Sequence, residues 1–438
     1  MTYILNPNLS IVRNHFNKKT YLSLPGVNDS VINDDAFRII SGEISNWQRI
    51  EKFQDFFRSS LEHGWIVKES NYKNENNPII REINYNYHLR RVQIESILQC
   101  NLTCAHCYCS SSPTAPAGFS TAEFKKLLEE LATMGVLTVD FTGGEPLLRK
   151  DIFDLIKYTR ELGMAATLFS NGLLITKEIA TKIKDYGVSR VQVSLDAFTP
   201  EIHNKIRGHA KAFQMAVDGI RNLKNADVNT SINIMVNKLN AHEIKELTDF
   251  IEHDLKVSFT LDRIIPSGRA LDTEDLALSN EEFYSLIRKT FPLRENLTSK
   301  ICDTANPTVS QVVEPGCGAG ASYCFIKYDG TVVLCPTLTE NEGQEFKSKR
   351  FQESSMKEIW LKHPTFVRFR GMQCENVGVC PVSSSCRGGC RSNAYLLHGH
   401  VNAPDEMSCN FNKNSGSDYV PFLELYKKKI YTLATVEA

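Results

Sequence analysis

The amino-acid sequence predicts an α/β protein whose central part is a parallel sheet curled into a barrel or partial barrel. Between residues 91 and 261, six apolar segments of strand length alternate with stretches that have helical periodicity. Strand–helix repeats of this kind build parallel sheets. The second observation concerns the 13 cysteines, of which four lie between Cys100 and Cys109 and nine lie from Cys302 onwards. This distribution predicts two metal-binding regions on either side of a cysteine-free body.

Residues 1–88 predict a small α+β domain and a linker. In residues 50–61, apolar side chains recur at helical spacing, and Gly64 is typical of the end of such a helix. The polar, Asn-rich residues 69–77 predict the linker. The strands expected in this domain are Tyr3–Leu5, Ser10–Arg13, Thr20–Ser23 and Trp65–Val67.

Residues 89–305 predict the barrel domain. One helix begins with the capping box Ser120-Thr-Ala-Glu123 and ends at Gly135, and another ends at Gly163. In such sheets the chemistry lies at the carboxyl ends of the strands. The six predicted strands are Val92–Leu98, Val136–Thr142, Ala166–Phe169, Arg190–Leu195, Ser231–Val236 and Val257–Leu261.

Length and charge limit the classes of function. A chain of 438 residues is long enough for about three domains. The net charge of −1 gives no support for nucleic acid or an anionic membrane as a partner. No run approaches the roughly 20 apolar residues of a membrane span, and no signal peptide is evident. We therefore expect a cytoplasmic protein, in which so many cysteines indicate metal ligands rather than disulfides.

Three cysteines form a compact cluster directly after the first predicted barrel strand. Cys100, Cys104 and Cys107 have the spacing C-x3-C-x2-C. Three soft thiolates suit a [4Fe-4S] cluster with one open iron, to which a small molecule can bind. Zinc is the alternative, since a structural zinc site needs four ligands and Cys109 or His106 lies close enough to complete it.

Small polar residues follow three more strands. Gly143-Gly144-Glu145-Pro146 follows the second strand, and its glycine carbonyls or N–H groups can hold an ammonium or a carboxylate. A tight strand-to-helix turn explains this sequence nearly as well. Ser170-Asn171-Gly172 and Ser194-Leu195-Asp196 follow the next two strands, where helix capping or turn chemistry is the alternative to ligand contact.

Together these motifs resemble the radical S-adenosylmethionine (radical SAM) enzymes, a family with a partial (β/α)6, TIM-like barrel. The resemblance covers about residues 90–270. It implies that Cys100, Cys104 and Cys107 hold a [4Fe-4S] cluster whose open iron is chelated by the amine and carboxylate of SAM. It also implies that one electron, from a donor such as flavodoxin or ferredoxin, cleaves SAM to methionine and a 5′-deoxyadenosyl radical.

The same resemblance assigns the remaining contacts to SAM. Arg207, in Lys-Ile-Arg-Gly, falls where related proteins neutralise the SAM carboxylate, and the alternative is a surface arginine. The other implied contacts are Gly143, Gly144 and Glu145 for the methionyl amine, Ser170, Asn171, Ser194 and Asp196 for the ribose or carboxylate, and His106 for the adenine.

The last region, residues 306–438, resembles the SPASM extension of radical SAM proteins, which carries two auxiliary [4Fe-4S] clusters. The implied ligands are Cys317, Cys324, Cys335 and Cys390 for one cluster and Cys374, Cys380, Cys386 and Cys409 for the other. Two zinc sites are the alternative. Five residues separate Cys374 from Cys380 where the family has two, so we expect a looped-out insertion at Glu375–Val379. Cys109 and Cys302 are expected to be small buried residues.

These features predict a three-domain peptide maturase. Residues 1–69 resemble, in size and element order, a winged-helix-like precursor-recognition domain, to which a leader peptide adds as a strand; a simple N-terminal cap is the alternative. The enzyme would abstract hydrogen from a ribosomally made peptide, and a cross-link would follow.

Pro336 stands where sulfatase-maturing relatives have a catalytic aspartate, which argues against sulfatase maturation. The alternatives are a peptide epimerase, a maturase of a peptide-derived cofactor, and a non-catalytic electron-transfer protein. The sequence identifies no catalytic base.

Overall fold

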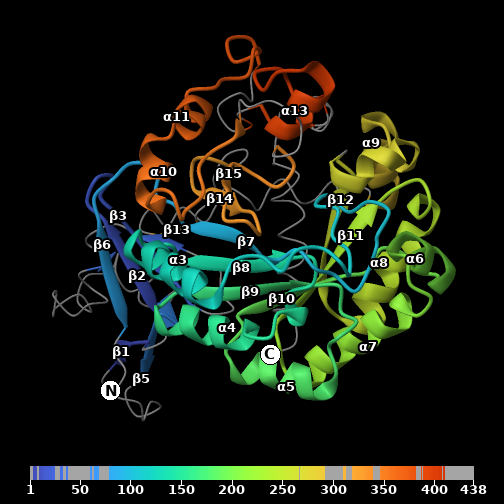
Figure 1. Cartoon of the computed structure of the whole chain (residues 1–438), viewed down its shortest axis with the longest axis horizontal. Helices are drawn as coiled ribbons and strands as arrows, with labels where there is room; N and C mark the ends of the chain where they lie inside the picture. The colour runs from blue at the N-terminus through green and yellow to red at the C-terminus, as the bar shows by residue number, and fades with distance from the viewer. Residues whose placement is uncertain are drawn as a thin grey trace.

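The protein is described here from a computed structural model (Figure 1). The residues that the structure describes are 3–6, 9–24, 30–32, 36–37, 60–61, 64–68, 78–265, 267–291, 309–311, 318–338, 346–380, 386, 388–406 and 408–409. The predicted helix in residues 50–61 and the predicted linker at 69–77 lie almost entirely outside these residues, as do Cys302 and Cys317.

An eight-stranded sheet forms the centre of the molecule, with strand order β12-β11-β10-β9-β8-β7-β14-β15. Its first six strands pair in parallel, which confirms the predicted partial barrel. Each strand begins and ends within two residues of its predicted bounds. The strands are β7 (Arg91–Ile97), β8 (Thr138–Gly143), β9 (Ala165–Ser170), β10 (Arg190–Ser194), β11 (Thr230–Val236) and β12 (Ser258–Arg263).

Helices cover the outer face of this sheet (Figure 1). Alternate strand residues such as Val92, Ile94 and Phe141 are fully buried in the core that the helices share with the sheet. The predicted capping box is present, because Ser120 Oγ accepts from the Glu123 backbone N–H at 3.3 Å. The helices are α3 (Thr121–Thr133), α4 (Ile152–Glu161), α5 (Lys177–Asp185), α6 (Pro200–Arg207), α7 (Ala212–Asn225) and α8 (Ile244–Phe250), the last continued by the π-helical η5 (Ile251–Leu255).

Four strands of the N-terminal region and β13, from residues 309–311, form a second sheet, called the N-terminal sheet, with strand order β13-β4-β3-β2-β6. The four predicted N-terminal strands are all present, whereas β4, β6 and β13 were not predicted, since each is short or lies beside residues of polar composition. The winged-helix likeness stays a prediction. The strands are β2 (Ser10–Asn14), β3 (Lys19–Ser23), β4 (Ser30–Ile32), β6 (Ile79–Ile83) and β13 (Val309–Gln311), while β1 (Tyr3–Leu5) pairs with β5 (Ile66–Lys68).

This N-terminal sheet docks at the amino ends of the barrel strands. The Arg81 guanidinium donates to the carbonyls of Val136 at 3.0 Å and Gly163 at 3.2 Å, just before β8 and β9. His88 Nε2 lies 2.8 Å from the carbonyl of Gly135 in the same loop. The cysteine triplet follows β7, at the opposite end of the sheet. The N-terminal sheet and the triplet therefore occupy opposite ends of the barrel.

The C-terminal region extends the barrel sheet instead of forming a detached unit. β14 (Tyr323–Ile326) pairs in parallel with β7, and β15 (Val332–Val333) pairs with β14. The helices of this region are α10 (Met356–Lys362), α11 (Pro364–Arg370) and α13 (Arg391–His398), and α9 (Asn280–Thr290) lies between β12 and this region in sequence. Among the described residues, no helix has the length and apolar character required to cross a membrane.

Candidate iron–sulfur and SAM site

The cysteine triplet lies in a loop that leaves the carboxyl end of β7. The Cys100 backbone N–H donates to the Ser112 carbonyl at 3.0 Å and closes this loop. Cys100 and Cys104 are buried, and Cys107 is half-buried. Because the loop continues directly from a central strand, the rigid sheet positions all three thiols.

Hydrogen-bond donors point at two of these sulfurs. The Leu102 backbone N–H lies 3.4 Å from Cys100 Sγ, and Asn171 Nδ2 lies 3.8 Å from the same atom. Arg207 Nη1 lies 3.9 Å from Cys104 Sγ. Burial raises the pKa of the Cys104 thiol, but the Arg207 guanidinium lowers it and favours the thiolate that ligates iron. In iron–sulfur proteins, hydrogen-bond donors point at the ligand sulfurs and tune the cluster. The donors around Cys100 and Cys104 therefore fit a [4Fe-4S] cluster.

The segment after β12 braces the triplet loop from the other side. This segment contains η6 (Gly268–Leu276). The Arg269 backbone N–H donates to the Cys107 carbonyl at 3.0 Å, and Arg269 Nε donates to the Cys104 carbonyl at 3.0 Å. Sequence reasoning missed Arg269. The only available signal was its position shortly after the sixth barrel strand.

Gly143, the last residue of β8, and Gly144, which follows it, allow the triplet loop to pack closely against this turn. A Cβ at Gly143 would lie 2.0 Å from the Ile97 carbonyl oxygen, and one at Gly144 would lie 2.1 Å from that of Gln99. The N–H groups of Gly144 and Glu145 donate to these same two carbonyls. The Gly144 N–H is therefore already used within the protein, and the expectation that the glycine carbonyls or N–H groups of this turn hold a ligand stays a prediction. Contact of this turn with the SAM amine stays a prediction.

Glu145 joins the second strand end to the third. Its carboxylate accepts from Ser170 Oγ at 2.9 Å and from the Asn171 backbone N–H at 2.8 Å. Burial raises the pKa of this carboxyl to about 7, although these hydrogen bonds lower it. The structure thus brings together Glu145, Ser170, Asn171 and Cys100, as the sequence predicts.

A buried ion pair forms at the fourth strand end. Arg207 Nε donates to Asp196 Oδ2 at 2.7 Å, and the Met235 backbone N–H donates to Asp196 Oδ1 at 3.0 Å. Arg207 is only 8% exposed, so the alternative of a surface arginine is wrong. Burial disfavours the charged form of Asp196, but Arg207, His106 and His203 together outweigh burial and lower the pKa of this carboxyl. The pair sits beside Cys104, where an anionic ligand group would meet the guanidinium.

The remaining predicted contacts lie at the same end of the barrel. His106 lies inside the triplet loop near Asp196 and Arg207, and burial lowers its pKa to about 4. Ser194 is the last residue of β10 and is half-buried. Cys109 is buried, with its sulfur 3.7 Å from that of Cys107 and 2.9 Å from Ser111 Oγ. Its role as a bystander stays a prediction.

Three cysteines predicted for the first auxiliary cluster are described. Cys324 lies in β14 and is fully buried, Cys335 follows β15, and Cys390 caps the amino end of α13. Burial raises the pKa of the Cys335 thiol to about 11, and the neighbouring Cys390 raises it as well. The influence of Cys390 on the Cys335 thiol places the two residues in the same neighbourhood, although 54 residues separate them in sequence.

The predicted insertion forms a hydrogen-bonded turn. The Val377 N–H donates to the Cys374 carbonyl at 2.9 Å, and the Cys380 N–H donates to the Asn376 carbonyl at 2.8 Å. Val379 at the tip is 83% exposed, in agreement with a looped-out segment. The cysteines predicted for the second cluster are all half-buried; they are Cys374, Cys380, Cys386 and Cys409.

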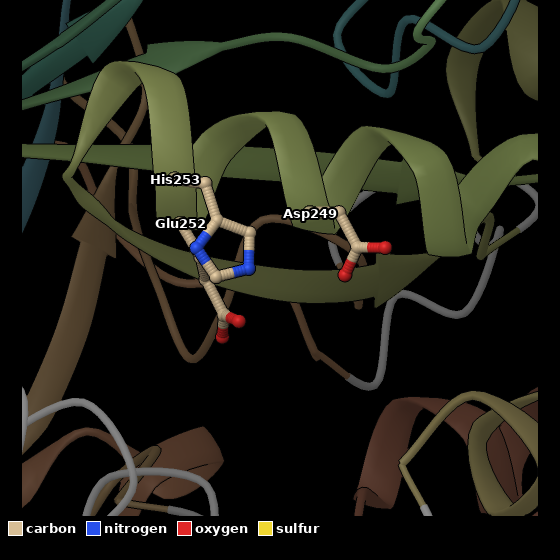
Figure 2. A group of neighbouring side chains, drawn as sticks. All are labelled: Asp249, Glu252 and His253. Atoms are coloured by element: carbon tan, nitrogen blue, oxygen red, sulfur yellow. The ribbon is translucent and has the colours of Figure 1, made fainter.

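Another group of possible metal ligands lies on the outer helices. Figure 2 shows Asp249, Glu252 and His253 on neighbouring turns of α8 and η5. Lys245 Nζ binds the Asp249 carboxylate at 2.5 Å, so a cation already occupies one side of this group. The group lies on an outer helix, away from the strand ends that carry the cysteines.

Two family models match the chain. The model of the Radical SAM superfamily matches residues 94–251, and the SPASM model, an iron–sulfur cluster-binding domain, matches residues 317–390. Together with the partial barrel and the thiol site, they define the class of this protein: it is a radical SAM enzyme that uses SAM and several [4Fe-4S] clusters. The chain belongs to the radical SAM superfamily and carries a SPASM domain. Iron–sulfur clusters therefore replace zinc as the assignment for both cysteine regions.

Its relatives within this class act on different substrates. The chain is 29% identical to the AdoMet-dependent heme synthase of Nitratidesulfovibrio vulgaris over 71% of this chain and 89% of that protein. It is 30% identical to the mycofactocin maturase MftC of Mycobacterium ulcerans over 70% of this chain and 84% of that protein. The crystal structure of Streptococcus suis SuiB bound to its precursor peptide SuiA matches with a TM-score of 0.61 at 16% identity, over 92% of this chain and 99% of SuiB.

Proposed function

We propose that this radical SAM enzyme oxidatively modifies a ribosomally synthesised precursor peptide and that the product contains a cross-link. When bound, the [4Fe-4S] cluster passes to SAM the electron that cleaves it to methionine and a 5′-deoxyadenosyl radical. The predicted ligands are Cys100, Cys104 and Cys107 for this cluster. Arg207 would hold the SAM carboxylate, and the turn at Gly143–Glu145 would hold its amine.

The extent of the structural likeness is the observation that carries the peptide assignment. SuiB, which binds a precursor peptide, matches 92% of this chain, so the match must extend into the N-terminal sheet. A likeness that includes the N-terminal sheet favours a substrate that needs an additional docking surface, as a peptide does.

The N-terminal sheet has an edge suited to a peptide strand. In the described part of the chain, β6 pairs only with β2, which leaves its other side for strand addition. Ile79 and Ile80 on this strand are 37% and 49% exposed, and such apolar side chains would pack against a bound leader. The N-terminal sheet and the cysteine triplet occupy opposite ends of the barrel, and β7 runs between these ends. At about 3.3 Å per residue, β7 is about 23 Å long. The bound leader and the modified residue of the peptide would therefore be about this far apart.

A porphyrin is the second candidate substrate. The heme synthase relatives and an Fe-coproporphyrin III synthase of Methanosarcina barkeri support it, the latter at 28% identity over 72% of this chain. For either substrate we expect a cytoplasmic enzyme that receives electrons from a donor such as flavodoxin or ferredoxin.

The test is anaerobic turnover with SAM, a reductant and synthetic peptides encoded by short open reading frames that gene sequencing identifies beside the gene. We expect 5′-deoxyadenosine and a peptide that has lost two hydrogens, both measured by mass spectrometry. A peptide of unchanged mass that takes up deuterium from D2O would indicate an epimerase. Reaction of iron-coproporphyrin III instead of the peptide would establish the second candidate, and the absence of 5′-deoxyadenosine in every reaction would contradict an enzymatic role.

A further inference from the structure

The inner face of the barrel sheet carries a row of polar side chains that the predicted SAM site does not use. Along β12, Phe259 and Leu261 are buried in the core, whereas Ser258, Thr260 and Asp262 point the other way and are half-buried or exposed. This alternation is the period of two expected for a strand with two different faces.

A chain of hydrogen bonds crosses this inner face and ends at Asp262. Gln192 Nε2 donates to Thr260 Oγ1 at 3.1 Å, and Thr260 Oγ1 donates to Asn233 Oδ1 at 2.7 Å. Because its oxygen accepts from Thr260, the Asn233 amide keeps its NH2 group for another acceptor, and its interaction with the Asp262 carboxylate opposes the rise in the pKa of that carboxyl. The chain orients one carboxylate on the inner face.

Asp262 lies at the end of the barrel that holds the SAM site. It is in register with Met235 on β11, and the Met235 N–H donates to Asp196, the partner of Arg207. Neighbouring strands are about 4.8 Å apart, so Asp262 lies near the predicted SAM contacts without being one of them. Five residues after it, Ser267 Oγ donates to the Tyr108 carbonyl in the triplet loop at 3.3 Å.

The SPASM domain approaches the same strand end. Arg263, which follows Asp262, interacts electrostatically with Asp405 and Cys390, and it donates to Asn280 of α9. Cys390 is a predicted ligand of an auxiliary cluster. Arg263 and Asp262 are consecutive residues, so their side chains leave β12 on opposite faces, and the SPASM domain meets this strand end through Arg263.

The Asp262 carboxylate has the properties of a proton acceptor. It is exposed on the inner face, yet the surrounding protein raises its pKa by desolvation. Among the described residues no lysine, arginine or histidine forms an ion pair with it, in contrast to Asp140, which pairs with Arg91 on the same face. A carboxylate without a cation, oriented by an amide, is free to take a proton from a substrate.

We propose that Asp262 accepts the proton that leaves the substrate during its oxidation, an assignment that rests on the proposed function. The 5′-deoxyadenosyl radical removes one hydrogen atom from a substrate carbon and becomes 5′-deoxyadenosine. The substrate must then lose one electron and one proton to form the new bond between that carbon and an N, O, S or C atom. A [4Fe-4S] auxiliary cluster is the class of one-electron oxidant required, and Asp262 Oδ takes the proton from the attacking N–H, O–H, S–H or C–H group.

The experiment compares Asp262→Asn and Asp262→Glu with the wild type, using the peptide from the neighbouring reading frame. We expect Asp262→Asn to keep its SAM cleavage within about threefold and to lose product by about 100-fold or more, the usual contribution of a general base. In freeze-quenched samples the organic substrate radical should accumulate and appear in the EPR spectrum. Asp262→Glu, which retains a carboxylate, should recover product. Asp249→Asn, the same change on the outer helix α8, is the matched control and should leave both products unchanged.

Three results would count against specific claims. Product formation by Asp262→Asn at the wild-type rate would overturn the assignment of the proton acceptor. A parallel loss of 5′-deoxyadenosine and product in both Asp262 variants would also overturn it, because Asp262 would then support SAM binding or the fold. A wild-type enzyme that cleaves SAM but leaves the peptide unchanged would contradict the proposed function itself.

Discussion

At the scale of single residues, the site is built from polar groups that bind one another before any ligand is added. Asp196 and Arg207 illustrate this. Each charge is buried, and each is compensated by the other at 2.7 Å. Removing one partner of a buried pair leaves the other charge without compensation, which costs more than the pair contributes. The pair thus keeps a guanidinium beside Cys104 at a depth where a lone arginine would be unfavourable.

We predict that Arg207→Met lowers the free energy of unfolding of the apo protein by about 3–5 kcal/mol. The reason is the uncompensated Asp196 carboxylate, so the double variant Arg207→Met/Asp196→Asn should regain much of the loss. Urea unfolding followed by circular dichroism measures both changes. Arg221→Met, at an exposed arginine with a loose 3.9 Å ion pair, is the matched control and should change the value by less than about 0.5 kcal/mol. Equal effects at the two positions would contradict this account.

At the scale of elements, the loops at the amino ends of β8 and β9 hold the N-terminal sheet. His88 is central to this contact. Its ring is buried, meets the Tyr21 ring edge-on at a centroid distance of 4.6 Å and binds the Gly135 carbonyl. Gly135 has a φ of +75°, and the left-handed conformation ends α3 there and exposes the carbonyl to His88. Gly135, the residue that ends α3, therefore also presents the carbonyl to which His88 binds.

The docking of His88 predicts an acid-sensitive contact. Burial lowers the pKa of His88 to about 3, so between pH 6.5 and 3 the unfolded chain binds a proton that the folded chain does not. Stability from this group is therefore fully present above about pH 6.5 and is lost as the pH falls. We expect the urea concentration at the midpoint of unfolding of the apo protein to be lower at pH 5 than at pH 7. This decrease should be smaller in His88→Gln, which keeps a donor for the Gly135 carbonyl. The exposed His253→Gln is the control, and an unchanged pH dependence in His88→Gln would refute the prediction.

At the scale of the whole molecule, one continuous sheet connects the two cysteine regions. β7 leads into the triplet, and its neighbour β14 contains Cys324. A rigid sheet fixes the separation of the clusters that these cysteines would hold, which is a requirement for directed electron transfer. The domain boundary predicted at residue 306 lies between β7 and β14 in sequence. In the structure these two strands are hydrogen-bonded neighbours in one sheet.

We predict that Cys100→Ala/Cys104→Ala/Cys107→Ala loses about one third of the iron of the reconstituted protein, because one of three [4Fe-4S] clusters depends on these thiolates. Formation of 5′-deoxyadenosine should stop, while the visible absorbance of the auxiliary clusters remains. Iron analysis and anaerobic absorbance spectra measure these outcomes. Cys109→Ala is the matched control, with full iron expected if Cys109 is a bystander. Full iron in the triple variant would show that these cysteines are not ligands.

Much of the architecture could be predicted because its signals are local. The six barrel strands are apolar runs bounded by turns, and the triplet and the Gly-Gly turn are contiguous motifs. Residues whose importance depends on neighbours distant in sequence could not be found in this way. Arg269 gives no local signal, although it binds two carbonyls of the triplet loop across more than 160 residues. Asp262 likewise resembles any polar residue at a strand end until the face of the strand is known.

The sequence by itself determined the class of this protein, since the ligand types and spacings that hold an open [4Fe-4S] cluster and SAM are encoded in short segments at successive strand ends. Only the tertiary structure decided that Arg207 is buried against Asp196, that the N–H groups of Gly144 and Glu145 are used by the triplet loop, and that Asp262 lies on the inner face of the barrel sheet. The physical reason is that burial, charge compensation and orientation arise from contacts between strands that lie far apart in the chain. A contiguous sequence motif indicates the type of chemistry, and the packing of the sheet decides which side chains can take part in it.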